Sequence, residues 1–263
     1  MNNVFSMPID NQASSKSGTA QRIPIRHMDF KFDSKDLDPV FFQNTTFASA
    51  YFHALSIFLT FGEDLVIDTA RHHRQFVKDE ALKARVTALI GQEAIHSKLH
   101  HEFNDTLAEN DYPVKFYRFL AEQVFKYGFK QLPNGMQLSL MAGIEHFTAV
   151  LAEYMMKHEE IFFLSQDEKQ RALWMWHMLE ECEHKDIAYD VYQQLSGDYL
   201  MRISGFGLAF VTILMLVPLG GVLFGAGMTL ANGCGARALV LLGQGNLRSF
   251  VVVLCLGIAA YIT

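Results

Sequence analysis

The stretch EECEHKDIAYD, residues 180–190, contains five acidic residues and one histidine. Residues three or four positions apart share one face of a helix. Glu181 lies three positions before His184 and Glu180 lies four before it, so either carboxylate can point with the imidazole at one centre. The stretch therefore indicates either a solvated acidic helix face or one half of a metal site.

A second stretch, GQEAIHSKLH at residues 91–100, favours the metal site. It places Glu93 three positions before His96. The same residue types at the same spacing, in a segment far away along the chain, predict two helices that point matching ligand pairs at one centre. We therefore prefer Glu181 to Glu180 as the partner of the histidine in the later stretch.

Two further glutamates stand alone in apolar surroundings: Glu63 in LTFGEDLVI and Glu145 in SLMAGIEHFTAVLA. One glutamate from each of two helices, with Glu-x-x-His from each of the other two, is the ligand set of ferritin-like dinuclear carboxylate proteins. Four carboxylates also balance the charge of two divalent ions. The predicted metal ligands are Glu63, Glu93, His96, Glu145, Glu181 and His184.

Helical periodicity covers the segment that carries these residues, and no segment alternates as a β-strand does. Long helices are predicted at residues 39–76, 79–109, 136–158 and 165–197. The expected fold is all-α: a ferritin-like four-helix bundle followed by a transmembrane helical tail. The bundle is expected at residues 25–199, after a polar, disordered N-terminal segment at residues 1–24.

Three other polar residues fall near the predicted metal face. His100 lies four positions after His96, His177 lies four before Glu181, and Glu153 lies about two turns beyond Glu145. Each is a candidate for an extra ligand or for a hydrogen-bonding neighbour that orients a ligand. An ordinary hydrogen-bonded helix histidine is an equal alternative for the two imidazoles.

Charge divides the chain into two unlike parts. All 28 acidic residues and all 11 histidines lie at or before Asp198, and only three arginines follow. The acidic first part disfavours nucleic acid as a partner. Residues 203–228 carry no charge and are long enough to span a bilayer. We expect residues 200–263 to be embedded in the inner (cytoplasmic) membrane, in contact with lipid, with the bundle facing the cytoplasm.

The motifs FGED, GQEAIHSKLHHEFN, GIEHFTAVLAE and MWHMLEECEHKDIAYDVY resemble a bacterial family labelled predicted metal-dependent hydrolase. The likeness covers about residues 25–199. It implies the same six ligands and includes His100 and His177 in the pattern.

Carboxylate and imidazole ligands without thiolate suit two iron ions, with manganese as the alternative. We therefore expect a membrane-attached, O2-activating oxidase or oxygenase with a small-molecule substrate, and the prediction allows a homodimer. A metal-dependent hydrolase is the alternative enzyme.

The tail is similar to a different family. The segment LFGAGMTLANGCGARALVLLGQGNLRSFVVVLCLGIAAYIT, residues 223–263, resembles part of the YeeE/YedE membrane proteins, which are linked to the uptake of sulfur compounds. That resemblance implies that Cys234 contacts the substrate. It makes a component or fragment of a sulfur-compound transporter a further alternative for the function.

Overall fold

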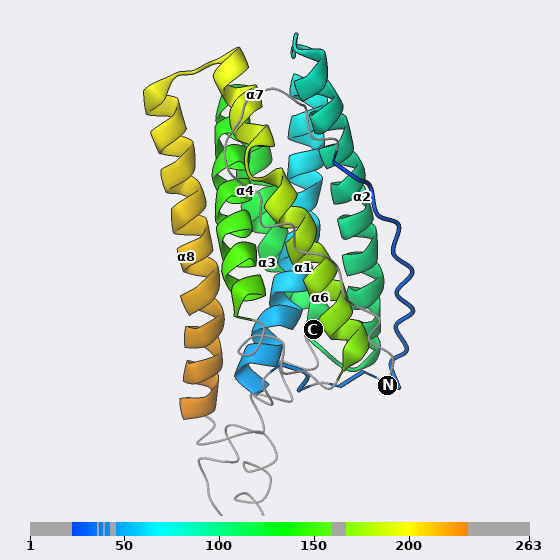
Figure 1. Cartoon of the computed structure of the whole chain (residues 1–263). Coiled ribbons are helices and arrows are strands. Elements are labelled where there is room, and N and C mark those ends of the chain that lie inside the picture. The colour runs from blue at the N-terminus through cyan, green and yellow to red at the C-terminus, as the bar shows by residue number, and fades with distance from the viewer. Residues whose placement is uncertain (1–22, 36, 39, 43–45, 159–166, 231–263) are drawn as a thin grey trace, which may run out of the picture.

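The computed structural model describes residues 23–35, 37–38, 40–42, 46–158 and 167–230, and over these ranges the secondary structure is all-helical, as predicted (Figure 1). The helices are α1 (Thr46–Arg74), α2 (Glu80–Glu109), α3 (Val114–Phe125), η1 (Phe129–Gln131), α4 (Asn134–Lys157), α6 (Glu168–His184), α7 (Ile187–Leu195) and α8 (Tyr199–Leu230). No strand occurs within the described ranges.

Two antiparallel helix pairs form the part of the fold that positions the candidate ligands. Helix α1 packs along α2, and α4 packs along α6 (Figure 1). Contacts of α1 with α4 and of α2 with α6 join the pairs around a common interior. Fully buried apolar side chains fill this interior, among them Leu65, Leu89, Leu140 and Leu173. Polar residues in the middle of these helices are thereby held away from solvent.

Two of the predicted helix boundaries differ from the structure. The first helix begins at Thr46, not at residue 39, because Phe41 and Phe42 are buried against other core aromatics in a non-helical segment. The helix predicted at residues 165–197 is divided by a turn after His184. This turn lets α7 bury its own apolar face against α2 and α4. The predicted start at Ser165 lies outside the described residues.

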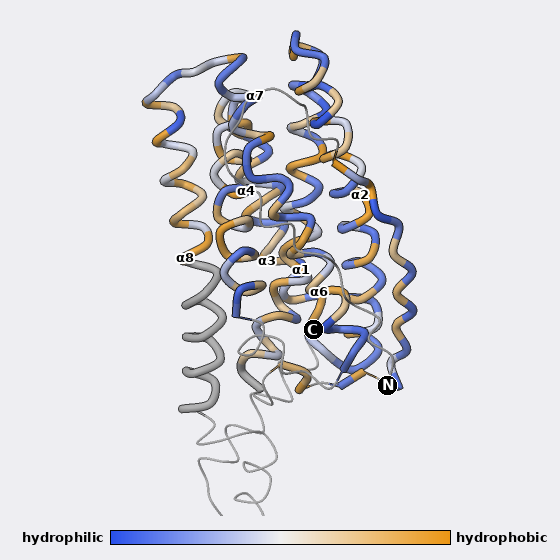
Figure 2. Tube along the Cα trace, in the orientation of Figure 1, coloured by the Kyte–Doolittle hydropathy of each residue, from blue (hydrophilic) through white to orange (hydrophobic). Residues whose placement is uncertain are grey.

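Helix α8 packs against α4 over the part whose side chains are described, which ends at Leu214. This part of α8 also exposes apolar residues, including Ile203, Val211 and Leu214, and apolar residues recur along it in Figure 2. The described apolar stretch of α8, Tyr199–Leu214, is shorter than a membrane span. The transmembrane tail and the domain boundary after residue 199 therefore stay predictions.

By length and composition, one helical stretch in the described part of the chain could cross a membrane, namely Ala48–Arg74 of α1. More than half of its most apolar window is buried by the rest of the protein. It also carries Glu63, whose side chain is enclosed by the neighbouring helices. These features are those of a core helix.

The close approach of α8 to α4 depends on glycine. A Cβ at Gly205 would lie 2.6 Å from the carbonyl carbon of Ser139. We expect Gly205→Ala to lower the free energy of unfolding by about 1–3 kcal/mol, because the two helices must move apart. Gly207, with nothing within 4 Å of its Cβ position, is the matched control. Gly207→Ala should raise stability by about 0.5–1 kcal/mol.

Urea denaturation of the full chain in detergent measures both effects. Equal effects of the two substitutions would contradict the close packing of α8 on α4.

Candidate metal centre

The structure brings all six predicted ligands together in the interior of the two helix pairs. Each of them is at most 5% exposed. They come from four helices: Glu63 from α1, Glu93 and His96 from α2, Glu145 from α4, and Glu181 and His184 from the last turn of α6. The three-residue spacing places both members of each Glu-x-x-His pair on the same inward face, as predicted.

Two of the carboxylates lie between the two imidazoles. Glu93 Oε1 is 2.9 Å from His184 Nδ1, and Glu93 Oε2 is 3.9 Å from His96 Nδ1. Glu181 Oε1 is 3.8 Å from both Nδ1 atoms. Glu145 lies on one side only, with Oε2 3.2 Å from His184 Nδ1. Glu93 and Glu181 therefore occupy the positions from which a carboxylate can serve two ions.

Several atoms at the centre of this cluster have no hydrogen-bond partner among the described residues. They are both carboxylate oxygens of Glu63, Oε2 of Glu145, and Nδ1 of His96 and His184. Buried polar atoms are nearly always paired, and leaving one unpaired costs about 1–3 kcal/mol. These five atoms are potential metal donors and lie in one place. The residues present therefore fit bound cations.

The outward nitrogens of the two imidazoles are hydrogen-bonded. Nε2 of His96 lies 2.9 Å from Glu180 Oε2, and Nε2 of His184 lies 3.1 Å from Gln92 Oε1. Both partner atoms are acceptors, so each Nε2 donates its proton outward. In the neutral ring each Nδ1 then has a lone pair directed into the cluster, which is the arrangement of a metal-ligating histidine.

These outer contacts also separate the two candidate glutamates of residues 180–190. Glu181 faces the imidazole Nδ1 atoms, whereas Glu180 lies on the outer side of His96. Glu180 is nevertheless fully buried. This geometry agrees with the preference for Glu181 over Glu180, but the contact of Glu180 with His96 was not predicted. Gln92 was not singled out by the sequence at all.

His177 and His100 extend the cluster along the interior. His177 Nε2 lies 3.1 Å from Glu181 Oε1, and His177 Nδ1 lies 2.9 Å from His100 Nε2. His100 Nδ1 contacts Ser56 Oγ at 2.8 Å, and this hydroxyl donates to Asn104 Oδ1. All five side chains are buried.

The proton positions along this series of hydrogen bonds follow from its last member, Asn104. The amide of Asn104 donates to the carbonyl of Ser56, so its oxygen must accept the Ser56 hydroxyl proton. His100 Nδ1 is therefore the donor to Ser56, and in the neutral ring His100 Nε2 accepts from His177 Nδ1. His177 Nε2, which faces Glu181, is then left either to carry a second proton or to bind a cation.

Two other predicted residues are not part of the cluster. Glu153 lies at the surface of α4 and forms ion pairs with Lys157 at 2.7 Å and Lys185 at 3.6 Å. The prediction of Glu153 as an extra ligand is wrong, because its helix position faces solvent rather than the interior. Cys234 lies outside the described residues.

Without a metal, the carboxyl groups of the cluster resist ionisation. Burial raises the pKa of Glu93 to about 8, although the charge of His184 opposes the shift. Burial also raises the pKa of Glu63, with further contributions from neighbouring carboxylates, and raises the pKa of Glu145 although His184 opposes the shift. Glu181 is the exception. Burial opposes its ionisation, but the hydrogen bond from His177 and the nearby imidazoles bring its pKa below the ordinary value.

The pKa values of two histidines of the cluster, His96 and His184, are shifted in opposite directions. Burial and the neighbouring His177 lower the pKa of His96 well below its ordinary value. For His184 burial acts in the same sense, but the charges of Glu93 and Glu145 raise its pKa well above the ordinary value. The metal-free cluster therefore retains protons that bound cations would displace.

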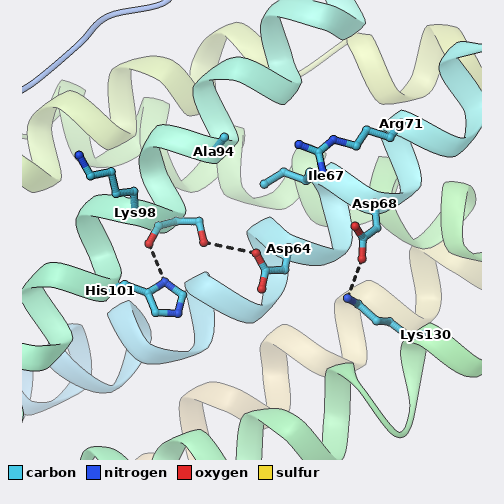
Figure 3. A pocket seen from close by; sticks show the side chains of 9 residues that line it. Asp64, Ile67, Asp68, Arg71, Ala94, Lys98, His101 and Lys130 are labelled. Carbon is cyan, nitrogen blue, oxygen red and sulfur yellow. Dashed lines mark hydrogen bonds and ion pairs between the residues drawn. The ribbon is translucent and has the colours of Figure 1, made fainter.

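A surface pocket of about 420 Å³ lies on the outer side of α1 and α2 (Figure 3). Two of its lining residues, Asp64 and Ala94, directly follow Glu63 and Glu93 in the sequence. Its charged lining residues are Asp64, Asp68, Arg71, Lys98 and Lys130. The pocket thus lies on the solvent side of the same segments of α1 and α2 whose inner side carries Glu63 and Glu93.

The helices and the cluster define an all-helical protein with buried glutamate and histidine groups that could hold metal ions. The sequence model of the family described as "Predicted metal-dependent hydrolase" matches residues 24–232. The chain belongs to this family, which confirms the first resemblance. No curated protein and no solved structure matches the chain.

The family match reaches well into α8, beyond the predicted end of the bundle at residue 199. The similarity to YeeE/YedE proteins is not shown. Most of the segment concerned, residues 223–263, lies outside the described part of the chain.

Proposed function

We propose that this chain is a dinuclear metal enzyme of ferritin-like four-helix architecture, with the site formed by the six ligands on α1, α2, α4 and α6. The observation that carries the proposal is the convergence of unpaired carboxylate oxygens and imidazole Nδ1 atoms in the buried interior. Four carboxylates would compensate two divalent charges that the protein interior could not otherwise accept. Iron is the favoured metal and manganese the alternative, because no thiolate is present among the donors.

The groups of donor atoms that lie close enough to share an ion support two positions. One group is Glu63, Glu93 and His96, and another is Glu93, Glu181 and His184. Glu93 belongs to both, as expected for a carboxylate between two ions. Glu145 would complete the second position through its contact with His184.

His177 is proposed as an additional ligand at the first position. It forms a group with His96 and Glu181 whose donor atoms could share an ion. The hydrogen-bond chain from Asn104 leaves its Nε2 lone pair directed at Glu181 once the second proton is lost. His100 would then act as the acceptor that fixes the ring of His177 rather than as a ligand.

For the reaction, we favour oxidation of a small-molecule substrate with O2. The carboxylate-rich donor set supports this choice, because hard oxygen ligands with imidazole suit iron, and bound iron would supply the electrons that O2 requires. The chain's own residues would hold the ions and exclude water from them. Metal-dependent hydrolysis is the second candidate, favoured by the description of the family. Bound metal would then polarise an ester or phosphate oxygen.

We further propose that α8 and the residues after it attach the enzyme to the cytoplasmic membrane. The exposed apolar side chains on the outer face of α8 support this proposal, since they continue into a segment of the sequence without charges. The helix pairs would then face the cytoplasm.

Full-length protein purified in detergent, loaded anaerobically with Fe(II), tests the reaction class. The oxidase proposal expects rapid O2 consumption on mixing with oxygenated buffer, and a Glu93→Gln variant should consume O2 no faster than free Fe(II). The hydrolase alternative expects cleavage of p-nitrophenyl acetate or bis(p-nitrophenyl) phosphate by the Mn(II)-loaded protein, without O2 consumption. A wild-type protein that binds no metal would contradict both.

A further inference from the structure

Residues 23–35, here called the strap, have no regular secondary structure and run along the outside of α2 (Figure 1). The strap is attached along its length. Ile25 packs over Gly91, where a Cβ would lie 2.6 Å from Ile25 Cδ1. Phe30 packs against Trp176 and Phe32 against Phe103, with ring centroids 5.9 Å and 5.0 Å apart. The strap is therefore packed onto the helices by half-buried side chains.

Arg26 of the strap forms ion pairs with two glutamates at the end of α6. Its guanidinium bonds Glu183 in a bidentate manner, at 2.7 Å and 3.0 Å, and bonds Glu180 Oε1 at 3.1 Å. The Glu180 side chain is fully buried, and that of Glu183 is 24% exposed. A planar guanidinium can hold two carboxylates in fixed orientations in a way that a lysine ammonium cannot.

Both carboxylates are linked by hydrogen bonds to the two imidazoles, one directly and the other through Gln92. Glu180 uses its second oxygen, Oε2, to accept from His96 Nε2 at 2.9 Å. Glu183 Oε2 accepts from the amide of Gln92 at 2.8 Å. The oxygen of the same amide then accepts from His184 Nε2 at 3.1 Å.

Gln92 is fixed by the strap a second time. Its Nε2 also donates to the carbonyl of Pro24 at 2.9 Å. The two amide protons of Gln92 are therefore both used, which fixes its oxygen as the atom that faces His184. One segment outside the helix pairs thus determines the orientation of both imidazoles.

We propose that the strap is a positioning element of the metal centre, in which Arg26, through Glu180 and through Glu183 with Gln92, holds His96 and His184 with Nδ1 directed inward. This inference rests on the proposed function, because it concerns ligands to the metal. It assigns a role to a segment that contributes no ligand. Binding of metal and docking of the strap should then be linked, and the linkage must be reciprocal.

Titration of the full-length, metal-free protein with Co(II), followed by visible absorption, tests the proposal. Loss of an outer partner of a ligating histidine typically weakens metal binding about 10–100-fold. We expect Arg26→Gln to weaken Co(II) binding by about this factor and to change the shape of the absorption band, which reports the ligand geometry. Arg26→Lys should restore only part of the affinity.

Lys31→Ala is the matched control. Lys31 lies on the same strap, pairs only with Asp29 at 3.6 Å, and has a side chain that is 85% exposed. The Lys31→Ala substitution should leave both the Co(II) affinity and the absorption spectrum unchanged. Equal Co(II) affinity and identical spectra for Arg26→Gln and Lys31→Ala would overturn the strap proposal while leaving the metal site intact. Absence of Co(II) binding by the wild type would overturn both.

Limited trypsin digestion of the wild type provides a second measurement that does not depend on a variant folding. Trypsin can cut after Arg26 only when the strap leaves its position. Co(II) should slow this cleavage about 10–100-fold, by the same linkage. Cleavage of an added unstructured peptide substrate serves as the reference for any direct effect of Co(II) on the protease. Equal cleavage rates after Arg26 with and without bound Co(II) would overturn the proposal.

Discussion

Glu93→Gln is expected to prevent the protein from holding a dinuclear metal centre. Glu93 lies between the two imidazoles, with carboxylate oxygens 2.9 Å from His184 Nδ1 and 3.9 Å from His96 Nδ1. An amide of the same shape cannot supply the negative charge that two neighbouring cations require. The loss of affinity should exceed the roughly 10–100-fold that removal of an outer hydrogen-bond partner causes. Glu181→Gln should behave in the same way.

Metal analysis after anaerobic loading with Fe(II) and removal of unbound iron measures the effect. The wild type should retain two ions per chain, and each variant should retain at most one. Glu153→Gln is the control, because this glutamate of α4 lies at the surface and pairs with Lys157. It should retain as much iron as the wild type.

The stability of the variant separates loss of ligand from loss of fold. In the metal-free protein Glu93 is a buried carboxyl group whose pKa is raised to about 8 by burial. A neutral amide at this position removes the cost of burying charge. Metal-free Glu93→Gln should therefore unfold at the same urea concentration as the wild type or at a higher one. Full iron content in a stably folded variant would show that Glu93 is not a ligand.

The six candidate ligands were predictable because helical periodicity converts sequence spacing into a shared face. Glu93 with His96 and Glu181 with His184 both follow this rule, and both pairs point inward in the structure. In the sequence, the pairing of Glu181 with His184 was preferred to that of Glu180 with His184 only because it repeats the spacing of Glu93 and His96. The preference for Glu181 depended on comparing two segments, since neither stretch would have been decisive alone.

Contacts between segments distant in the sequence were not predictable. Gln92 meets His184, and Arg26 meets Glu180 and Glu183, through the packing of α2, α6 and the strap, which no local pattern encodes. The only local signal was the position of Gln92 directly before a predicted ligand. Glu153 was misassigned because its distance from Glu145 along the helix is not a whole number of turns. The side chain of Glu153 is therefore rotated away from the inward direction of Glu145.

Removal of metal is expected to reverse the dependence of stability on pH between about 6.5 and 8. Metal-free protein should become less stable as pH rises through this range, whereas protein with excess Mn(II) should become more stable. The reversal follows from the same buried groups. Without metal they need protons, and with metal they must lose them.

The sign for the metal-free protein follows from proton counts. An unfolded glutamate is ionised above a pKa of about 4.3, whereas folded Glu93 keeps its proton up to about pH 8. The pKa values of Glu63, Glu145 and His184 are also raised in the folded state. The native state therefore binds more protons than the unfolded state in this range, and stability falls as pH rises. The lowered pKa of His96 opposes this trend only at the lower end of the range, because an unfolded histidine loses most of its proton between about pH 6.5 and 7.5.

Each group that keeps its proton only in the folded state contributes about 1.4 kcal/mol per pH unit. Glu93 alone should therefore lower the free energy of unfolding by about 1.4 kcal/mol between pH 6.5 and 7.5. Urea denaturation of full-length protein in detergent, with EDTA or with excess Mn(II) at each pH, measures both slopes. Subtracting the two curves removes the contribution of every group outside the metal centre.

Glu93→Gln supplies the control for this assignment. In metal-free protein the substitution should reduce the downward slope by about the contribution of one proton, since an amide does not titrate. In the presence of Mn(II) it should remove most of the upward slope, because the variant binds metal weakly. Parallel slopes for the wild type with EDTA and with Mn(II) would mean that metal binding displaces no protons from these residues, and the buried carboxylates and imidazoles would then not be the ligands.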